Sequence, residues 1–188
     1  MTLADAFAPG AIGLAALAAC WIMLPAWLPN PIAALFGGGR PIDGGRVLRD
    51  GYRVLGNGKT WRGFAAGVLA GLAIGAVQIA VQNLSLPVPL PVQTPLTVLA
   101  LAVGALLGDM GKSFFKRRLG KDRGAAWPVV DQFDLVVGAF VLLALVDTGW
   151  IATNVTLPVL VFIVILTPLL HRIMNLIGYA AGIKEEPW

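Results

Sequence analysis

The distribution of basic residues constrains the fold of this chain more than any other feature. Six Lys or Arg residues lie within residues 36–63 and six within residues 108–133, and Arg172 and Lys184 lie near the C-terminus. Long apolar stretches without any Lys or Arg separate these clusters. Basic residues near the ends of apolar helices resist translocation, so they collect on the cytoplasmic side of a membrane. The pattern predicts an integral membrane protein whose basic loops face the cytoplasm.

Composition supports a membrane protein and argues against other classes. The 188 residues are 57% hydrophobic and 13% charged, with a mean hydropathy of +0.80, which is too apolar for a soluble domain. The length suits one membrane domain over residues 1–188. The net charge of +4 is explained by topology and by anionic lipid headgroups, and no nucleic-acid-binding pattern is visible. The lone Cys20 permits neither an internal disulfide nor a Cys-based metal site.

Five apolar stretches are long enough to cross a membrane as helices, since a span needs about 20 residues. The predicted spans are residues 10–36, 63–83, 96–115, 131–150 and 155–182, with cytoplasmic loops over residues 37–62 and 116–130. No basic residue precedes Arg40, so the N-terminus is expected outside and the C-terminus in the cytoplasm. The predicted fold is therefore an all-α, multi-pass protein of the cell membrane. Asp147 is expected to be a solvated residue at the outer end of the fourth span.

The second predicted span carries glycines on one face. Gly63, Gly67, Gly71 and Gly75 recur every fourth residue, so a neighbouring helix can approach its backbone closely. Packing within the chain is the first interpretation, and a homodimer contact is the alternative. The proline-rich segment Leu84–Pro95 that follows predicts an external loop. No repeat suggests an inverted duplication, which weakens a transporter interpretation.

The first polar segment, residues 37–62, is rich in glycine and ends where the second span begins. Lys59, Thr60 and Arg62 lie at that boundary. Glycine-rich loops expose main-chain N–H groups, and a helix N-terminus carries partial positive charge, so the two together suit a phosphate. The alternative is a flexible basic loop that lies on anionic headgroups.

The second polar segment combines acids with bases. Asp131 and Asp134 are three residues apart and share one face of a helix, where they would repel each other unless a cation lay between them. Carboxylate oxygens of this kind suit Mg²⁺ with bound phosphates. The alternative is that both are ordinary first-turn residues favoured by the helix dipole. Asp109 argues against that alternative, because it lies toward the inner end of an apolar helix, where an acid defaults to a function.

Basic residues in excess accompany these acids and suit anionic substrates. The polar residues after Asp109 include Lys112, Ser113, Lys116, Arg117, Lys121 and Asp122. Their Gly-Lys-Ser run is not a P-loop, because Leu106 occupies the first glycine position of that motif and a membrane helix precedes it. We predict a site whose catalytic residues are Asp109, Lys116, Asp131 and Asp134.

These residues resemble the signature of the membrane cytidylyltransferases that make CDP-activated lipids. The CDP-diacylglycerol synthases carry Ser-x-x-Lys-Arg, Lys-Asp and Asp-x-x-Asp runs. The matching residues here, in order, are Ser113, Lys116, Arg117, Lys121, Asp122, Asp131 and Asp134. The spacing between the Lys-Arg and Lys-Asp pairs is one residue shorter than in that family. The stretch from Lys59 resembles a Lys-Thr-x-Glu-Gly element, with Arg62 in place of the acid.

The small archaeal branch of this group, the CDP-archaeol synthases, is the closer resemblance. The chain is similar to it in size, in its five spans, in the Pro-Ile-Asp-Gly-Gly run at residues 41–45 and in the Gly-Lys-Thr-Trp-Arg-Gly run at residues 58–63. The resemblance covers the whole chain. It implies that CTP and 2,3-bis-O-(geranylgeranyl)glycerol 1-phosphate react, with Mg²⁺, to give CDP-archaeol and pyrophosphate.

The predicted mechanism is an in-line attack of the lipid phosphate on the α-phosphorus of CTP at the cytoplasmic face. Asp109, Asp131 and Asp134 are expected to hold Mg²⁺. The expected ligands of the triphosphate are Lys112, Ser113, Lys116 and Lys121, with Arg117 and Asp122 beside them. Lys59, Thr60 and Arg62 are expected to hold phosphate from the opposite loop. Two alternatives remain, a CDP-diacylglycerol synthase acting on ester-linked phosphatidic acid and a small non-enzymatic membrane transporter.

Overall fold

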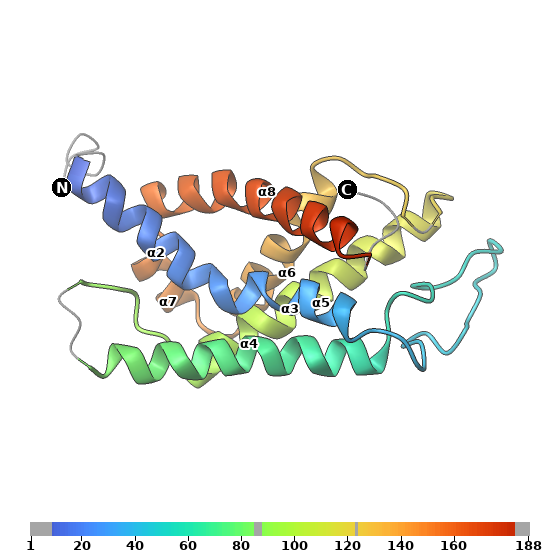
Figure 1. The fold of residues 1–188 in the computed structure, drawn as a ribbon, viewed down its shortest axis with the longest axis horizontal. Coiled ribbons are helices and arrows are strands. Elements are labelled where there is room, and N and C mark those ends of the chain that lie inside the picture. Colours follow the sequence, from blue (N-terminus) through green and yellow to red (C-terminus); the bar gives the residue numbers. More distant parts are fainter. Residues whose placement is uncertain (1–8, 85–87, 123, 183–188) are drawn as a thin grey trace.

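The computed structural model describes residues 9–84, 88–122 and 124–182, and within them the chain is all-helical apart from two isolated β-bridges (Figure 1). The helices are α2 (Pro9–Trp27), α3 (Pro29–Leu35), α4 (Trp61–Gln82), α5 (Pro95–Arg118), α6 (Val130–Val146), α7 (Thr148–Asn154) and α8 (Leu157–Ala180). Lys184 lies outside the described residues, and the predicted external segment Leu84–Pro95 is described only in part. The helical fold confirms the predicted all-α class.

Four segments are long and apolar enough to cross a membrane. They are Gly10–Leu35, which joins α2 and α3, and the helices α4, α5 and α8. Together α6 and α7 qualify as a fifth, but the chain bends by 120° between them. The predicted helix over residues 131–150 is therefore two helices. The break occurs because the carboxylate of Asp147 accepts a hydrogen bond from the main-chain N–H of Trp150 at 2.8 Å, which caps α7. Asp147 is thus a capping residue, not only a solvated one.

The core lies where α2, α5, α6 and α8 meet. Ile22, Leu101, Leu143 and Ile163 are fully buried there. α5 extends three residues beyond its predicted end, to Arg118, and carries three basic residues in its last turn. Positive charge at that position offsets the partial negative charge of a helix C-terminus. The extension places on a rigid helix the basic side chains that the sequence pattern assigns to a loop.

The glycine stripe of α4 packs against neighbouring helices of the same chain. Its four glycines are buried. A Cβ atom on Gly67 would lie 2.7 Å from the carbonyl oxygen of Pro29, and one on Gly75 would lie 2.6 Å from Cγ2 of Val98. Such distances leave no room for a side chain. The glycines therefore pack against helices of the same chain, which confirms the first interpretation of the sequence.

A second glycine contact joins α5 to α6. A Cβ atom on Gly104 would lie 2.6 Å from the carbonyl oxygen of Gly138, and one on Gly138 would lie 2.6 Å from Cα of Gly108. A Cβ atom on Gly108 would lie 2.9 Å from the carbonyl carbon of Asp134. The two helices thus touch main chain to main chain. This contact sets Asp134 beside the turn of α5 that carries Asp109.

The segment between α3 and α4 is held together by one buried carboxylate, that of Asp43. Its Oδ2 accepts hydrogen bonds from the N–H groups of Leu55 and Gly56 at 3.0 Å and from Nε of Arg53 at 3.1 Å. Its Oδ1 accepts from Nη2 of Arg53 at 2.5 Å and from the N–H of Gly45 at 3.1 Å. The segment is therefore hydrogen-bonded structure, in contrast to the flexible loop considered from the sequence. The N–H groups of Gly45 and Gly56 are used within it and do not point to a phosphate.

Replacing Asp43 with asparagine should open this segment. Burial favours the neutral acid, but the hydrogen bonds from Arg53 and the three N–H groups outweigh it and hold the pKa of Asp43 well below its usual range. A depressed pKa means that the stabilisation is complete above the unfolded-state value of about 3.9 and is lost only as the pH falls through the lower folded-state value. We expect wild-type protection of the Leu55 and Gly56 amides to persist down to about pH 4.

Hydrogen exchange, corrected for intrinsic rates, measures this protection. A hydrogen bond to a charged group is worth about 1.5–3 kcal/mol, so Asp43→Asn should lower protection at neutral pH by about tenfold or more. Asp122→Asn, which removes a carboxylate outside this segment, serves as the control. Equal protection in wild type and Asp43→Asn would contradict the role of the charge.

Candidate functional site

Three carboxylates converge on one ammonium group between α5 and α6. Nζ of Lys112 lies 2.7 Å from Oδ2 of Asp134, 3.1 Å from Oδ1 of Asp109 and 3.5 Å from Oδ1 of Asp131. We call Asp109, Asp131 and Asp134 the acidic centre. The side chain of Asp134 is only 3% exposed, so the centre lies largely away from solvent.

Two more lysines complete the cluster. Nζ of Lys116 lies 2.6 Å from Oδ1 of Asp131 and donates to the carbonyl oxygen of Ala125 at 2.7 Å. Lys59, which directly precedes the N-cap of α4, donates to Oδ2 of Asp109. Three lysines, Lys59, Lys112 and Lys116, thus face the three carboxylates of the acidic centre, and their formal charges cancel.

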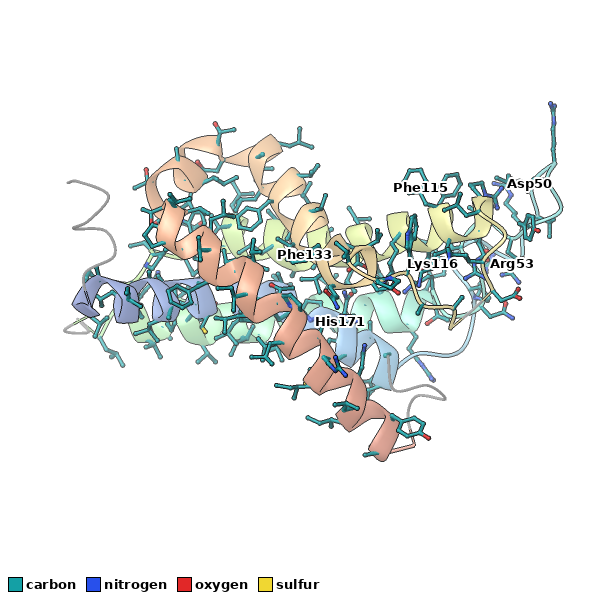
Figure 2. The ribbon with its side chains drawn as sticks, turned by 90° about the horizontal axis from the view of Figure 1, so that it is seen from above. Asp50, Arg53, Phe115, Lys116, Phe133 and His171 are labelled. Carbon is teal, nitrogen blue, oxygen red and sulfur yellow. The ribbon has the colours of Figure 1, made fainter. Side chains whose placement is uncertain are left out.

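Helical spacing explains why these groups meet. Asp109, Lys112 and Lys116 follow one another at three- and four-residue intervals and so share a face of α5. Asp131 and Asp134 share a face of the first two turns of α6 for the same reason. The glycine contact between the two helices brings both faces together. Figure 2 shows Lys116 near the C-terminal end of α5, at the same end of the molecule as Asp50 and Arg53 of the segment between α3 and α4.

The acidic centre has the donor chemistry of a site for a hard cation. Oδ1 of Asp131 and Oδ2 of Asp134 are buried, and each is ion-paired with a lysine ammonium, at 2.6 Å from Lys116 and 2.7 Å from Lys112. Clustered carboxylate oxygens of this kind suit Mg²⁺, which takes oxygen ligands. Within the described ranges, no three such side chains stand at metal-binding distances from one another. The ammonium of Lys112 holds the position between them.

A pocket adjoins the acidic centre on the other side of Asp109. Its cavity volume is about 80 Å³. Its lining comes from α3, α4, α5 and the segment before α4: Asn30, Ala33, Ala34, Ile42, Gly58, Lys59, Thr60, Gly63, Phe64, Leu106, Asp109 and Met110. The Lys59–Asp109 ion pair therefore connects the acidic centre to this mostly apolar pocket.

The other predicted site residues of the first polar segment stand at the junction of α3 and α4. Thr60 is buried and caps α4, accepting a hydrogen bond from the N–H of Gly63 at 3.1 Å. Arg62 donates through Nε to the carbonyl oxygen of Phe36 at 2.9 Å and through Nη2 to that of Gly37. Thr60 thus reaches the pocket, while Arg62 closes the chain after α3.

The remaining predicted residues lie in or just after the last two turns of α5. Ser113 is buried on α5, and Nε of Arg117 is buried without a hydrogen-bond partner among the described residues. Lys121 and Asp122 make main-chain hydrogen bonds, to Lys116 and from Ala125. In the described part of the chain, the side chains of Lys121 and Asp122 form no ion pair with the acidic centre.

One residue that joins the two polar segments was not predicted. Nη1 of Arg118 lies 2.7 Å from Oδ2 of Asp50, and Nη2 donates to the carbonyl oxygens of Tyr52 at 3.2 Å and Arg53 at 2.5 Å. Its guanidinium also lies over the ring of Phe114, 5.2 Å from the centroid. The sequence held no signal for this contact, because Arg118 is more than 60 residues away from these partners along the chain. Arg118 thus fixes the first polar segment to the end of α5.

Comparison with known proteins finds similar proteins along most of the chain. Residues 12–188 match the family described as "CarS-like: CDP-archaeol synthase". The CDP-archaeol synthase of Methanosphaerula palustris is 61% identical over 166 residues, and that of Methanosarcina barkeri is 50% identical over 175 residues. Each match covers 88% of this chain and 100% of the relative. A solved structure, described as an intramembrane enzyme for archaeal membrane lipids biosynthesis, is 37% identical with a TM-score of 0.65, over 89% of this chain and 94% of that chain.

Proposed function

The chain belongs to the CDP-archaeol synthase family of membrane enzymes, and from this premise we propose that it transfers CMP from CTP to 2,3-bis-O-(geranylgeranyl)glycerol 1-phosphate. The products are CDP-archaeol and pyrophosphate. The observation that carries the proposal is the cluster of three carboxylates and three lysines contributed by α5, α6 and the segment before α4, next to a mostly apolar pocket. Such a cluster suits the meeting of two anionic substrates.

In the proposed reaction, an oxygen of the lipid phosphate forms a bond to the α-phosphorus of CTP, and the bond to the β-phosphate oxygen breaks. A phosphate monoester is already ionised near neutral pH, so no strong base is required, and positioning with charge neutralisation carries the rate. Lys112 and Lys116 bind the triphosphate, and the acidic centre would hold Mg²⁺. When bound, Mg²⁺ supplies neutralisation of charge on the phosphate oxygens.

We place the lipid headgroup in the pocket beside Asp109. Its walls come from three apolar helices, and Lys59 at its boundary supplies a cation for the lipid phosphate. Thr60 adds a hydroxyl group on the same side. Ser113, Arg117, Lys121 and Asp122 remain proposed ligands on the nucleotide side, and Arg62 remains a proposed phosphate ligand that would first have to leave the carbonyl groups of Phe36 and Gly37.

Filling this pocket should weaken lipid binding alone. Ala34→Phe adds a ring to the pocket wall, and we expect the KM for the lipid to rise by about tenfold, since losing the burial of a few methylene groups costs about 1–2 kcal/mol. The affinity for CTP should stay unchanged. Leu69→Phe, on the exposed face of α4, is the matched control. If the KM for CTP rose instead, the pocket would belong to the nucleotide.

The proposed topology has five spans, with α6 and α7 forming the fourth. The N-terminus lies outside, and both polar segments and the C-terminus lie in the cytoplasm. Leu84 and Val47 are exposed and test the two sides. In a Cys20→Ala background, an impermeant thiol reagent added to intact cells should label Leu84→Cys. It should label Val47→Cys only after permeabilisation. Labelling of Val47→Cys in intact cells would reverse the assignment and with it the cytoplasmic location of the site.

The activity itself is tested by incubating the purified protein with radiolabelled CTP, Mg²⁺ and lipid phosphate. An ether-linked prenylated lipid and an ester-linked phosphatidic acid are tried in parallel. We expect label in the lipid fraction with the ether-linked substrate. Label with the ester-linked lipid alone would favour a CDP-diacylglycerol synthase, and no label with either lipid would reject nucleotidyl transfer.

A further inference from the structure

The three lysines that suit phosphate groups are already engaged by the acidic centre. Lys112 contacts all three of its carboxylates, while Lys59 and Lys116 contact Asp109 and Asp131. A divalent cation held by these carboxylates would compete for them with the Lys112 ammonium. Two cations beside the same carboxylates would repel each other strongly.

We propose that Lys59, Lys112 and Lys116 exchange partners during substrate binding. In the ligand-free protein, the lysines neutralise the acidic centre. When the carboxylates take a divalent cation, the lysines are released, and Lys112 and Lys116 bind the nucleotide phosphates. This inference rests on the proposed function, and it adds an order of events that the function does not require.

The geometry supports an exchange because it keeps charge balanced at both stages. A largely buried carboxylate or ammonium is destabilised without a partner, so an exchange that keeps both sets paired is favoured at each stage. Lysine suits the exchange, because its compact ammonium on a flexible stem can swing between partners. Asp109 belongs to the acidic centre and also lines the pocket, as Lys59 does, so Lys59, once released, is already at the proposed lipid site.

The exchange couples the metal to the nucleotide. Without a metal, CTP must compete with the carboxylates for the lysines, so the affinity of the wild-type protein for CTP is low in a chelator. A carboxylate removed by mutation should release a lysine as the metal does. Asp109 is the suitable position, because it pairs with both Lys59 and Lys112, and asparagine preserves its shape.

Calorimetric titration with CTP in EDTA tests this coupling. We expect Asp109→Asn to bind CTP about tenfold more tightly than wild type, the order expected for one additional charge-assisted hydrogen bond. Asp50→Asn is the matched control, because it removes a carboxylate and releases Arg118 outside the cluster. The control should change the affinity by less than about twofold, since the altered charge is screened by salt. If Asp109→Asn does not fold, Asp131→Asn replaces it, because that change releases Lys116.

A second measurement examines the same exchange from the metal side. Lys112→Met removes the ammonium and keeps an unbranched side chain that reaches as far as Cε. Titration with Mn²⁺ in the absence of nucleotide, followed by the electron paramagnetic resonance signal of free Mn²⁺, should show about tenfold tighter binding than in wild type. Lys121→Met, which removes a lysine outside the cluster, should show little change.

The outcomes separate this inference from the proposed function. If wild type neither binds CTP with Mg²⁺ nor labels lipid, the proposed function fails. If wild type does both, the exchange is overturned when either Asp109→Asn binds CTP in EDTA no better than wild type or Lys112→Met binds Mn²⁺ no better than wild type. Tighter binding in both variants, without tighter binding in the two controls, establishes the exchange.

Discussion

Replacing Asp134 with asparagine is expected to abolish CMP transfer while leaving the protein folded. The Asp134 side chain is 3% exposed and lies 2.7 Å from Nζ of Lys112. Asparagine preserves its shape but loses the charge that would hold a cation and offset the lysine. Removing a preorganised electrostatic partner of a transition state lowers kcat by about 10²–10³-fold. We therefore expect activity near the detection limit of the radiolabelled assay at every Mg²⁺ concentration.

Asp147, the carboxylate directly after the same helix, is the control for this prediction. Asp147 follows the last residue of α6, at the opposite end from Asp134, and it caps α7. Asp147→Asn keeps a side-chain oxygen that can accept the same hydrogen bond and should retain full activity. Turnover by Asp134→Asn within a few fold of wild type would remove this residue from the set of metal ligands.

Gly138→Ala should damage both stability and activity. The added Cβ atom would lie 2.6 Å from Cα of Gly108, and a main-chain atom cannot move aside as a flexible side chain can. α6 must therefore move away from α5, at a cost of about 1–3 kcal/mol in the free energy of unfolding. The same movement would shift Asp134 away from Asp109, and a displacement of about 1 Å can cost 10²-fold in rate.

Gly111→Ala is the matched control on α5. A Cβ atom at that position would meet nothing within 4 Å. Alanine is favoured over glycine within a helix by about 0.5–1 kcal/mol, so this variant should be at least as stable as wild type. Thermal unfolding in detergent, combined with the labelled-lipid assay, compares the two variants. A stable and active Gly138→Ala protein would show that the contact between the helices is not required.

The acidic centre was largely predictable from local spacing. The three-residue interval between Asp131 and Asp134 predicts a shared face, and the position of Asp109 near the inner end of an apolar helix predicts that it meets them. The structure brings all three together around Lys112. The sequence placed Lys59, Lys112 and Lys116 in the same site as phosphate ligands, but their ion pairs with the carboxylates were not predictable, because several of these pairs depend on how closely α5 approaches α6 and the start of α4. The approach of α5 to α6 is set by a contact between glycines on separate helices.

Features that depend on one capping residue or on one long-range contact could not be predicted from the sequence. Composition makes residues 131–150 one apolar span, yet the carboxylate of Asp147 captures the N–H of Trp150 and turns the chain. Asp43 stands in a glycine-rich run that suggests phosphate binding, but its carboxylate organises the segment around itself. In both cases one acidic side chain satisfies main-chain N–H groups, and hydropathy carries no information on that competition.

The main-chain contact between α5 and α6 has a consequence for engineering. The main-chain contact between α5 and α6 fixes the position of Asp134 relative to Asp109, and this position does not depend on the side chains that line the pocket. The pocket wall formed by α3 and α4 should therefore tolerate redesign without retuning the chemistry. Libraries randomised at Ala34 and Phe64 could be screened for acceptance of altered lipid headgroups, with turnover per bound substrate preserved. Reaction and substrate range would then be separately adjustable properties of one small scaffold.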